Sequence, residues 1–240
     1  MKIVRKSKNA FNKTKRYKIV NRIKKHKNNN LFKSLCRICQ TKTNQNLKTY
    51  CTIGIGGVGK YVCFPKSVGQ VKKLVHFLNK KNIKFFILGN GSNIVFEDCG
   101  YSGVLISLKK LNKIYFCEQK LTAYSGVNLF VLNNFCLQKS LTGSEFSYGI
   151  PASVGGAVFM NAGAFGKEMA DVVKSVWVLD KNRIKKLCVK QLDYYYRHSV
   201  FMKGGKYQNA IILKAELKLK SGESEKIKET QTKHLFETAN

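Results

Sequence analysis

Two glycine-rich stretches carry the residue types best suited to hold a ligand through its phosphate groups. The first, LGNGSN at Leu88 to Asn93, has one glycine on each side of an asparagine and lies between two β-like runs. Such a loop can point successive N–H groups into one concavity, and the hydroxyl and amide side chains beside it add polar contacts, which is how a backbone nest holds an anion. A plain β-turn uses the same residues, so this loop by itself leaves both interpretations open.

The second stretch, YGIPASVGGAVFMNAGAFG at Tyr148 to Gly166, has five glycines and one proline among small apolar residues. It keeps neither the period of a strand nor that of a helix for long, so it is not patterned for core packing. Glycine allows positive φ angles and lets another group approach the backbone closely. Together the two stretches predict one extended ligand, with a pyrophosphate at one end and a flat group at the other.

A third stretch, GIGGVGKY at Gly54 to Tyr61, contains G-x-G-x-x-G and falls one residue short of a P-loop. A P-loop needs a Ser or Thr hydroxyl for magnesium after its lysine, but Tyr61 stands there, followed by VCFP where a helix should begin. A dinucleotide-binding motif would need an acidic residue about 20 positions further on, and that residue is missing. A P-loop nucleotide hydrolase is therefore kept only as the alternative enzyme.

The cysteines give a weak metal signal. Cys36 and Cys39 form a single C-x-x-C, and Cys51 and Cys63 follow at wide spacing, whereas a structural zinc site usually presents two tight pairs. The pattern favours buried or idle thiols, and we predict no metal site.

The charge balance raises a second alternative, a basic nucleic-acid-binding protein. The chain has 44 Lys and Arg against 13 Asp and Glu, and no carboxylate side chain occurs before Glu97. The excess is mostly lysine and is spread through every segment, which is typical of compositional drift rather than of one binding surface. We predict no nucleic-acid partner, although such a field favours anionic ligands.

The composition fits a globular protein, with 44% apolar residues. Neither a run of about 18 uncharged apolar residues nor an apolar segment behind the basic N-terminus occurs, so no membrane span and no secretory signal is predicted. We expect a cytoplasmic protein, where the eight cysteines remain thiols.

Short alternating elements must position the glycine loops. Ser67 can cap a helix whose apolar side chains, from Val68 to Leu78, share one face, and a second helix is predicted from Leu129 to Gln138. The run SVWVLD turns through DKN into RIKKLCV as a hairpin. Further strand-like runs are IKFFILG, IVFED, GVLISL, KLTAYSGV and AIILKAELKLK. Strands outnumber helices without a regular βαβ rhythm, which predicts an α+β fold.

Three motifs resemble a known family. FILGNGSNIVF, LTGSEFSYGIPASVGGAVFMNAGAFGKEM and YYYRHSVF occur in the order and spacing of UDP-N-acetylenolpyruvoylglucosamine reductases, and the resemblance runs from about Asn44 to Lys220. It implies a two-lobed α+β FAD-binding fold of the vanillyl-alcohol oxidase and PCMH type, with FAD bound noncovalently between the lobes. It also implies a UDP-N-acetylmuramate dehydrogenase of peptidoglycan biosynthesis, in which NADPH reduces FAD and the flavin passes hydride to the enolpyruvyl group of a UDP-sugar.

The resemblance also assigns site residues. It places the pyrophosphate on the first glycine loop and the ribityl chain and flavin ring on residues 149–164. The implied cofactor-binding residues are Gly89, Asn90, Gly91, Ser92, Asn93, Gly149, Ile150, Pro151, Ala152, Ser153, Gly155, Gly156, Asn161, Gly163 and Ala164. Tyr196 and Arg197 are the implied substrate-binding residues. Arg197 is also the implied catalytic residue, because a guanidinium fork meets a carboxylate whose charge grows in the transition state.

The chain also departs from the family. The family has a third, C-terminal substrate domain that carries a proton-donating serine and a late glutamate, and nothing up to Asn240 matches them. We therefore expect a flavin-binding fragment with impaired activity, whose missing domain a separate C-terminal chain would have to supply. The expected organisation is a mobile basic arm over residues 1–43, an FAD-binding domain over 44–221 with lobes 44–107 and 108–221, and a helical tail over 222–240 that starts a truncated substrate domain.

Overall fold

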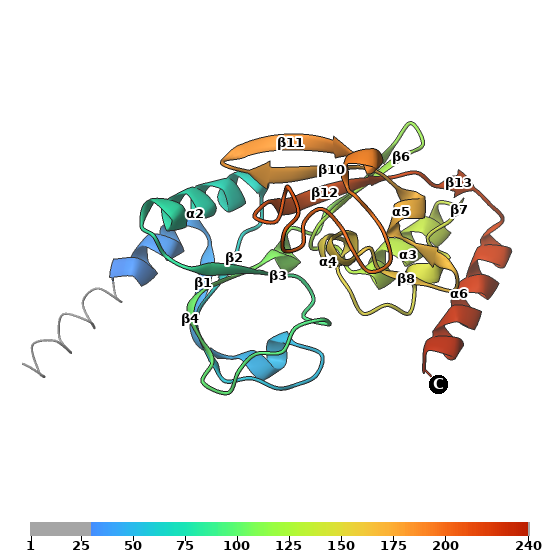
Figure 1. The fold of residues 1–240 in the computed structure, drawn as a ribbon. Helices are drawn as coiled ribbons and strands as arrows, with labels where there is room; N and C mark the ends of the chain where they lie inside the picture. The colour runs from blue at the N-terminus through green and yellow to red at the C-terminus, as the bar shows by residue number, and fades with distance from the viewer. Residues whose placement is uncertain (1–29, 240) are drawn as a thin grey trace, which may run out of the picture.

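A computed structural model describes residues 30–239 and builds them around two main β-sheets (Figure 1). The first sheet has the strand order β1-β2-β4-β3. Its strands are β1 (Gln40–Asn46), β2 (Val58–Phe64), β3 (Phe85–Leu88) and β4 (Tyr101–Ser107). β1 is antiparallel to β2, whereas β2, β4 and β3 are parallel neighbours. The carboxyl ends of these three strands therefore share one edge, and the predicted phosphate loop leaves from it.

Helix α2 (Val68–Lys80) packs on the first sheet as the sequence predicts. The Ser67 hydroxyl accepts a hydrogen bond from the Gln70 backbone N–H at 3.2 Å and so caps the first turn. One face of the helix is buried in the core that also contains Val104 and Ile106 of β4. The buried residues of that face are Val71, Leu74, Val75 and Leu78.

The second sheet has the order β11-β10-β12-β6-β5, and all neighbouring pairs are antiparallel. Its strands are β5 (Ile114–Cys117), β6 (Lys120–Tyr124), β10 (Val173–Asp180), β11 (Arg183–Cys188) and β12 (Ile211–Leu217). The predicted hairpin is confirmed as β10 and β11. Its two turn residues, Lys181 and Asn182, have φ of 45° and 63°, the left-handed values that a two-residue type I′ turn requires.

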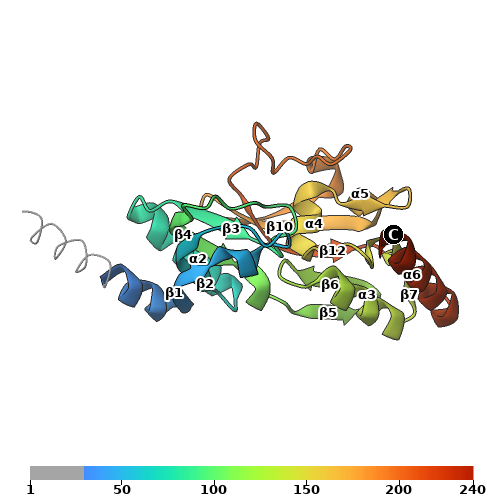
Figure 2. The ribbon, with the colours of Figure 1, turned by 90° about the horizontal axis from the view of Figure 1, so that it is seen from below.

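Helices α3 (Leu129–Gln138) and α4 (Val154–Met160) lie on one face of the second sheet, and α5 (Met169–Val172) precedes β10 (Figures 1 and 2). α3 has the predicted bounds, whereas α4 was not predicted. The apolar side chains of α3 and α4 share one core with the inward residues of the sheet. Members of this core include Leu129, Leu132, Val154, Ala157, Val176 and Ala215.

The two sheets also share side chains in a second core. Leu179 of β10 and Ile211 and Leu213 of β12 are buried with Leu74 of α2 and Ile106 of β4. The first sheet and α2 therefore pack directly on one end of the second sheet.

Helix α6 (Ser224–Ala239) is the last described element and forms where the helical tail is predicted. It buries Ile227 and Gln231, and the Gln231 amide donates a hydrogen bond to the Asn133 carbonyl of α3 at 3.1 Å. The remaining short elements are η1 (Leu47–Tyr50), η2 (Leu108–Lys110), η3 (Glu145–Ser147), η4 (Val189–Gln191), the strand pair β7 (Leu141–Thr142) and β13 (Lys220–Ser221), and the pair β8 (Gly163–Ala164) and β9 (Lys167–Glu168). Across residues 30–239, no helix combines the length and apolarity that a membrane crossing needs.

Two expectations about local structure are wrong. Residues 30–43 are not a mobile arm, because residues 30–38 form a helix with Leu35 fully buried, and β1 begins at Gln40. Leu31, Phe32 and Ile38 pack on the same core, so this helix has an apolar face that the surrounding lysines obscure in the sequence. Residues 1–29 lie outside the described residues. The run IVFED forms no strand; it is an irregular segment tied to Gly57 through the Glu97 carbonyl.

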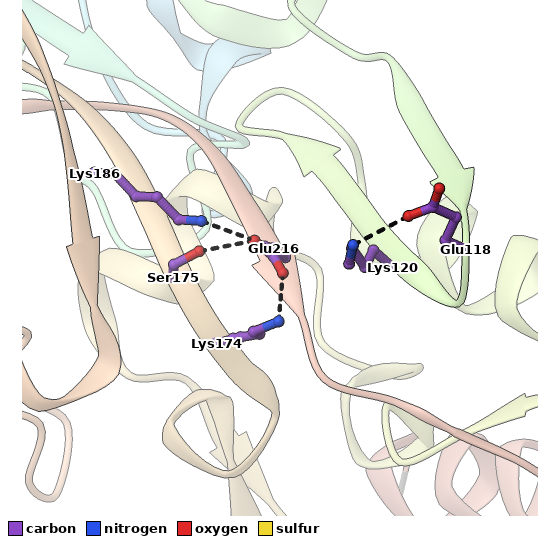
Figure 3. Close-up of polar contacts among 6 residues, drawn as sticks. All are labelled: Glu118, Lys120, Lys174, Ser175, Lys186 and Glu216. Carbon is purple, nitrogen blue, oxygen red and sulfur yellow. Dashed lines mark hydrogen bonds and ion pairs between the residues drawn. The ribbon is translucent and has the colours of Figure 1, made fainter.

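Glu216 of β12 is a buried carboxylate held by three partners (Figure 3). Lys174 Nζ lies 2.9 Å from Oε1, Lys186 Nζ lies 3.3 Å from Oε2, and the Ser175 hydroxyl donates to Oε2 at 3.1 Å. The hydrogen bond from Lys174 is the main cause that lowers the pKa of Glu216 below its usual value, and Lys186 and Ser175 add to it.

We expect Glu216→Gln to destabilise the fold by about 2 kcal/mol at pH 7, since a buried hydrogen-bonded charge is lost. The folded-state pKa lies below the unfolded one, so this stabilisation is present above the unfolded pKa, about 4.3, and disappears as the pH falls through the folded pKa. Urea unfolding at pH 7 and again near pH 3 measures both effects. The difference between the two proteins should shrink at the lower pH.

The matched control is Glu118→Gln. Glu118 lies in the turn between β5 and β6 and pairs with Lys120 at 3.2 Å, and the two side chains are 77% and 59% exposed (Figure 3). An exposed pair is worth less than about 1 kcal/mol, so this variant should unfold almost like the parent protein. Equal losses of unfolding free energy in the two variants would contradict the larger stabilisation assigned to the buried Glu216 carboxylate.

Candidate functional site

The two predicted glycine stretches lie side by side. The Asn90 amide donates to the Pro151 carbonyl at 2.9 Å, and the Asn93 amide lies 3.3 Å from the Met160 sulfur. A side chain on Gly89 would come within 2.8 Å of the Ser153 hydroxyl. Residues separated by more than sixty positions therefore form one surface, as a single extended ligand requires.

The first loop is pressed against the segment that follows η1. Gly91 has φ of +82°, and a Cβ there would overlap the Tyr50 carbonyl. The Thr52 N–H donates to the Gly91 carbonyl at 3.0 Å and fixes the loop in place. Gly91 is thus glycine for two reasons, its left-handed backbone and its close approach to another chain segment.

The second stretch has more internal structure than its sequence suggests. Ser153 caps α4 by accepting a hydrogen bond from the Gly156 N–H at 3.3 Å. The Gly155 N–H donates to the Ser125 carbonyl at 2.9 Å, and a Cβ on Gly155 would lie 2.7 Å from the Ser125 Cβ. A Cβ on Gly163 would lie 2.5 Å from the Lys167 carbonyl. Some of these glycines are therefore required by contacts within the chain, and not only by a ligand.

The residues present fit a phosphate-bearing cofactor. Gly89, Ser153 and Gly156 form a cradle between β3 and α4 that a single added methyl group would fill. Two buried serine hydroxyls, those of Ser107 and Ser125, have no hydrogen-bond partner among the described residues. Ser107 is paired with Leu88 at the end of β3, and Ser125 contacts Gly155, so both residues are next to the glycine stretches.

Ser107 and Ser125 were missed in the sequence. Neither lies in a glycine-rich or polar motif, and only the tertiary pairing brings them beside the two stretches. No signal in a single sequence would have found them.

The other predicted cofactor residues line the same surface or support it. Ser92 and Gly149 are half-buried, Ala152 is buried, and Ile150 packs on the core of α3 and α4. Ala164 belongs to the short strand β8 after α4. Asn161 differs from the rest, because its amide is bonded to backbone groups of Tyr195 and Ala170.

Arg197 contacts the second stretch near its C-terminal end. Its guanidinium donates to the Gly163 carbonyl at 2.9 Å and remains exposed. The neighbouring Tyr196 is 82% exposed, and the guanidinium carbon lies 5.9 Å from its ring centre. Only one donor of the guanidinium is used by Gly163, so the other N–H groups can meet an anion. The structure therefore brings the predicted arginine and the predicted cofactor stretch together.

The alternative P-loop interpretation is wrong. The lysine of GIGGVGKY lies inside β2, and this strand continues to Phe64 where a P-loop requires a helix. Gly57 packs against Asp98 and Gly100, so these glycines serve contacts between chain segments.

The eight cysteines, all within the described residues, form no disulfide. Cys39 and Cys63 are buried, and the Thr41 hydroxyl lies 3.5 Å from the Cys63 sulfur. The pKa of Cys39 is lowered, chiefly by a hydrogen bond with the Cys63 thiol, whereas the pKa of Cys63 is raised by the same bond and by burial. No three His, Cys, Asp or Glu side chains of residues 30–239 are grouped as metal ligands.

Comparisons with known proteins also indicate a cofactor-binding chain. A family model described as an FAD binding domain matches residues 59–182, just over half of the chain. The UDP-N-acetylenolpyruvoylglucosamine reductase of Clostridium novyi (strain NT) is 41% identical over 190 residues, which cover 79% of this chain and 61% of that protein. The enzyme of the same name from Lactiplantibacillus plantarum is 38% identical over 189 residues, with 78% and 61% covered. The chain thus spans about three fifths of the length of the curated relatives it matches.

Solved structures share the fold. A crystal structure of UDP-N-acetylenolpyruvylglucosamine reductase from Thermus caldophilus aligns with a TM-score of 0.67 and 27% identity, over 81% of this chain and 67% of that chain. An alkyldihydroxyacetonephosphate synthase aligns with a TM-score of 0.52 and 17% identity, over 69% of this chain and 32% of that chain, which shows a common fold alone.

Proposed function

Because the chain belongs to the FAD-binding domain family, we propose that it is the flavin-binding part of a UDP-N-acetylenolpyruvoylglucosamine reductase. The predicted two-lobed α+β fold of the vanillyl-alcohol oxidase and PCMH type is confirmed by the family match and by the two solved structures. FAD is the cofactor of this family, and when bound it supplies hydride chemistry that no side chain can supply.

We propose that the loop Gly89–Asn93 binds the FAD pyrophosphate and that residues 149–164 line its ribityl chain and ring. The contact between these two segments, at Asn90 and Pro151 and again at Gly89 and Ser153, is the observation that carries this proposal. Ser107 and Ser125, whose buried hydroxyls have no partner among the described residues, lie next to the same two segments. The strongly positive net charge of the chain also favours binding of a dianionic pyrophosphate.

The activity itself is part of the proposal, because the chain spans only about three fifths of the reductases it resembles. The reaction would be the NADPH-dependent reduction of the enolpyruvyl group of a UDP-sugar in peptidoglycan biosynthesis. Arg197 would hold the enolpyruvyl carboxylate and stabilise the negative charge that grows on it, and Tyr196 would line the substrate site. The position of Arg197 supports the role of carboxylate binding, since its guanidinium is bonded to the Gly163 carbonyl and keeps further donors for an anion.

A complete reductase also needs a proton donor. The family resemblance places that group in a C-terminal substrate domain, which a longer form of this protein or a separate chain would provide. We propose a cytoplasmic setting, because the eight cysteines form no disulfide and a reducing compartment keeps thiols in this state.

The proposal predicts a yellow protein whose flavin is noncovalently bound. Purified protein should show flavin absorbance, and acid denaturation should release the cofactor as free FAD, since neither Cys nor His occurs between Tyr148 and Gly166. Saturating FAD should also raise the melting temperature, because ligand that binds only the folded state stabilises it. A folded sample that takes up no FAD and gains no thermal stability would refute the proposal.

A further inference from the structure

The turn that presents Arg197 is held in a strained conformation. Residues 195–198 form a tight turn in which the His198 N–H donates to the Tyr195 carbonyl at 2.9 Å. Arg197 has φ of 52°, in the left-handed region that costs an ordinary residue about 1–2 kcal/mol. Such strain persists only where the surrounding structure fixes the backbone. Some nearby group must therefore hold this turn.

The C-terminal end of α4 provides that support. The Tyr194 hydroxyl donates to the Val158 carbonyl at 3.1 Å, and the Ser199 hydroxyl donates to the Phe159 carbonyl at 2.5 Å. Both carbonyls lie in the last turn of α4, where helical hydrogen bonds run out, and Val158 receives only a long bond of 3.5 Å from the Asn161 N–H. Tyr194 and Ser199 are the residues immediately before and after the turn. Their hydrogen bonds attach both sides of the turn to the segment proposed to line the flavin.

Asn161 attaches the first residue of the turn. It follows α4 with φ of 44° and is only 1% exposed. Its Nδ2 donates to the Tyr195 carbonyl at 3.1 Å, the same oxygen that closes the turn with His198. Its Oδ1 accepts a hydrogen bond from the Ala170 N–H at 3.0 Å. Both polar atoms of this side chain are thus bonded to the protein backbone.

We infer that Asn161 is a positioning residue for Arg197, rather than a side-chain ligand of the cofactor. Its amide ties the Arg197 turn to the end of α4, and it thereby sets the distance between the guanidinium and the proposed flavin surface. This inference rests on the proposed function, because it gives the turn its purpose as the holder of a substrate carboxylate. The hydrogen-bond geometry of the turn is independent of that purpose.

The test replaces Asn161 with glycine, because glycine adopts the left-handed conformation without strain and removes only the two side-chain bonds. The matched control is Asn182→Gly, which also removes an asparagine at positive φ. Asn182 lies in the turn of the β10–β11 hairpin, and its amide is 3.3 Å from the ring of His76 in α2. Three quantities are measured. FAD affinity is measured by titrating the apoprotein. Exchange of the His198 amide hydrogen and the change of flavin absorbance on titration with UDP-N-acetylenolpyruvoylglucosamine are measured in the FAD-loaded protein. Asn161→Asp, which keeps the acceptor for Ala170 and loses the donor, serves as the second variant.

In both Asn161 variants we expect the His198 amide to exchange about tenfold faster and the UDP-sugar to bind about tenfold more weakly, as the loss of one buried hydrogen bond implies. FAD affinity should change less than about threefold, and Asn182→Gly should leave all three quantities unchanged. Unaltered His198 exchange, or a loss of FAD affinity as large as the loss of UDP-sugar affinity, would overturn the inference. If the parent protein shows no flavin response to the UDP-sugar, the proposed substrate fails, while His198 exchange still decides the role of Asn161.

Discussion

Flavin binding is expected to be lost in Gly91→Ala, with an FAD affinity at least about 100-fold weaker than that of the parent protein. A Cβ at this position would overlap the Tyr50 carbonyl and lie 2.9 Å from the Cys51 Cα, and neither backbone atom can rotate away. The φ of +82° adds backbone strain for any residue with a side chain. Overpacking costs about 1–3 kcal/mol, and the strain raises that figure further, so the loop has to move away from its partner segment.

The measurement is FAD titration of the apoprotein by absorbance, together with urea unfolding. Gly204→Ala is the matched control, because Gly204 also has a positive φ, +89°, but no atom lies within 4 Å of the added methyl group. It should show the strain alone, about 1–2 kcal/mol of stability, with unchanged FAD affinity. FAD affinity in Gly91→Ala equal to that of the control would mean that the loop Gly89–Asn93 does not bind the cofactor.

Binding of the UDP-sugar should weaken by about 10- to 100-fold in Arg197→Lys. Lysine keeps the charge, but it lacks the planar fork that meets a carboxylate with two parallel hydrogen bonds, and hydrogen bonds to charged groups are worth about 1.5–3 kcal/mol. Lysine bears the same backbone strain at φ of 52°, so the fold should keep its stability. In any preparation that turns over, kcat should fall as well, because the charge on the substrate grows in the transition state.

The ligand chosen separates this role from a general loss of affinity. UDP-N-acetylglucosamine lacks the enolpyruvyl carboxylate, so Arg197→Lys should leave its binding almost unchanged while it weakens binding of UDP-N-acetylenolpyruvoylglucosamine. The control variant is Arg183→Lys, at an exposed position on β11 outside the glycine stretches. Equal losses for both ligands would argue that Arg197 contacts the nucleotide or shapes the fold, and not the carboxylate.

Local signals in the sequence predicted much of the frame. α2 followed from a capping serine and a one-sided apolar pattern, and the β10–β11 hairpin followed from two strand-like runs joined through DKN. The two glycine stretches were predicted to share one ligand, and the structure brings them into contact, while their binding of that ligand stays a prediction. Each of these inferences uses information confined to about a dozen neighbouring residues.

What the sequence did not predict depends on contacts between distant segments. The helix over residues 30–38 was hidden because its apolar face lies in a lysine-rich context and is completed only by the core around α2. The glycines of α4 argued against a helix, yet Ser153 caps it and its apolar side chains are buried against the second sheet. Asn161 looked like one more polar residue of a cofactor stretch, because its partner, Tyr195, lies 34 positions further on.

The core that the two sheets share restricts how the molecule can move. Leu179, Ile211 and Leu213 from the second sheet are buried among side chains of α2 and the first sheet, so a hinge opening between the lobes would expose them. Exposing large aliphatic side chains costs about 1.5–3 kcal/mol each, and several would be exposed together. We therefore expect opening of this kind to be rare, with the two sheets staying packed together while a ligand binds. The same coupling makes the two sheets one cooperative unit, which should melt in a single transition.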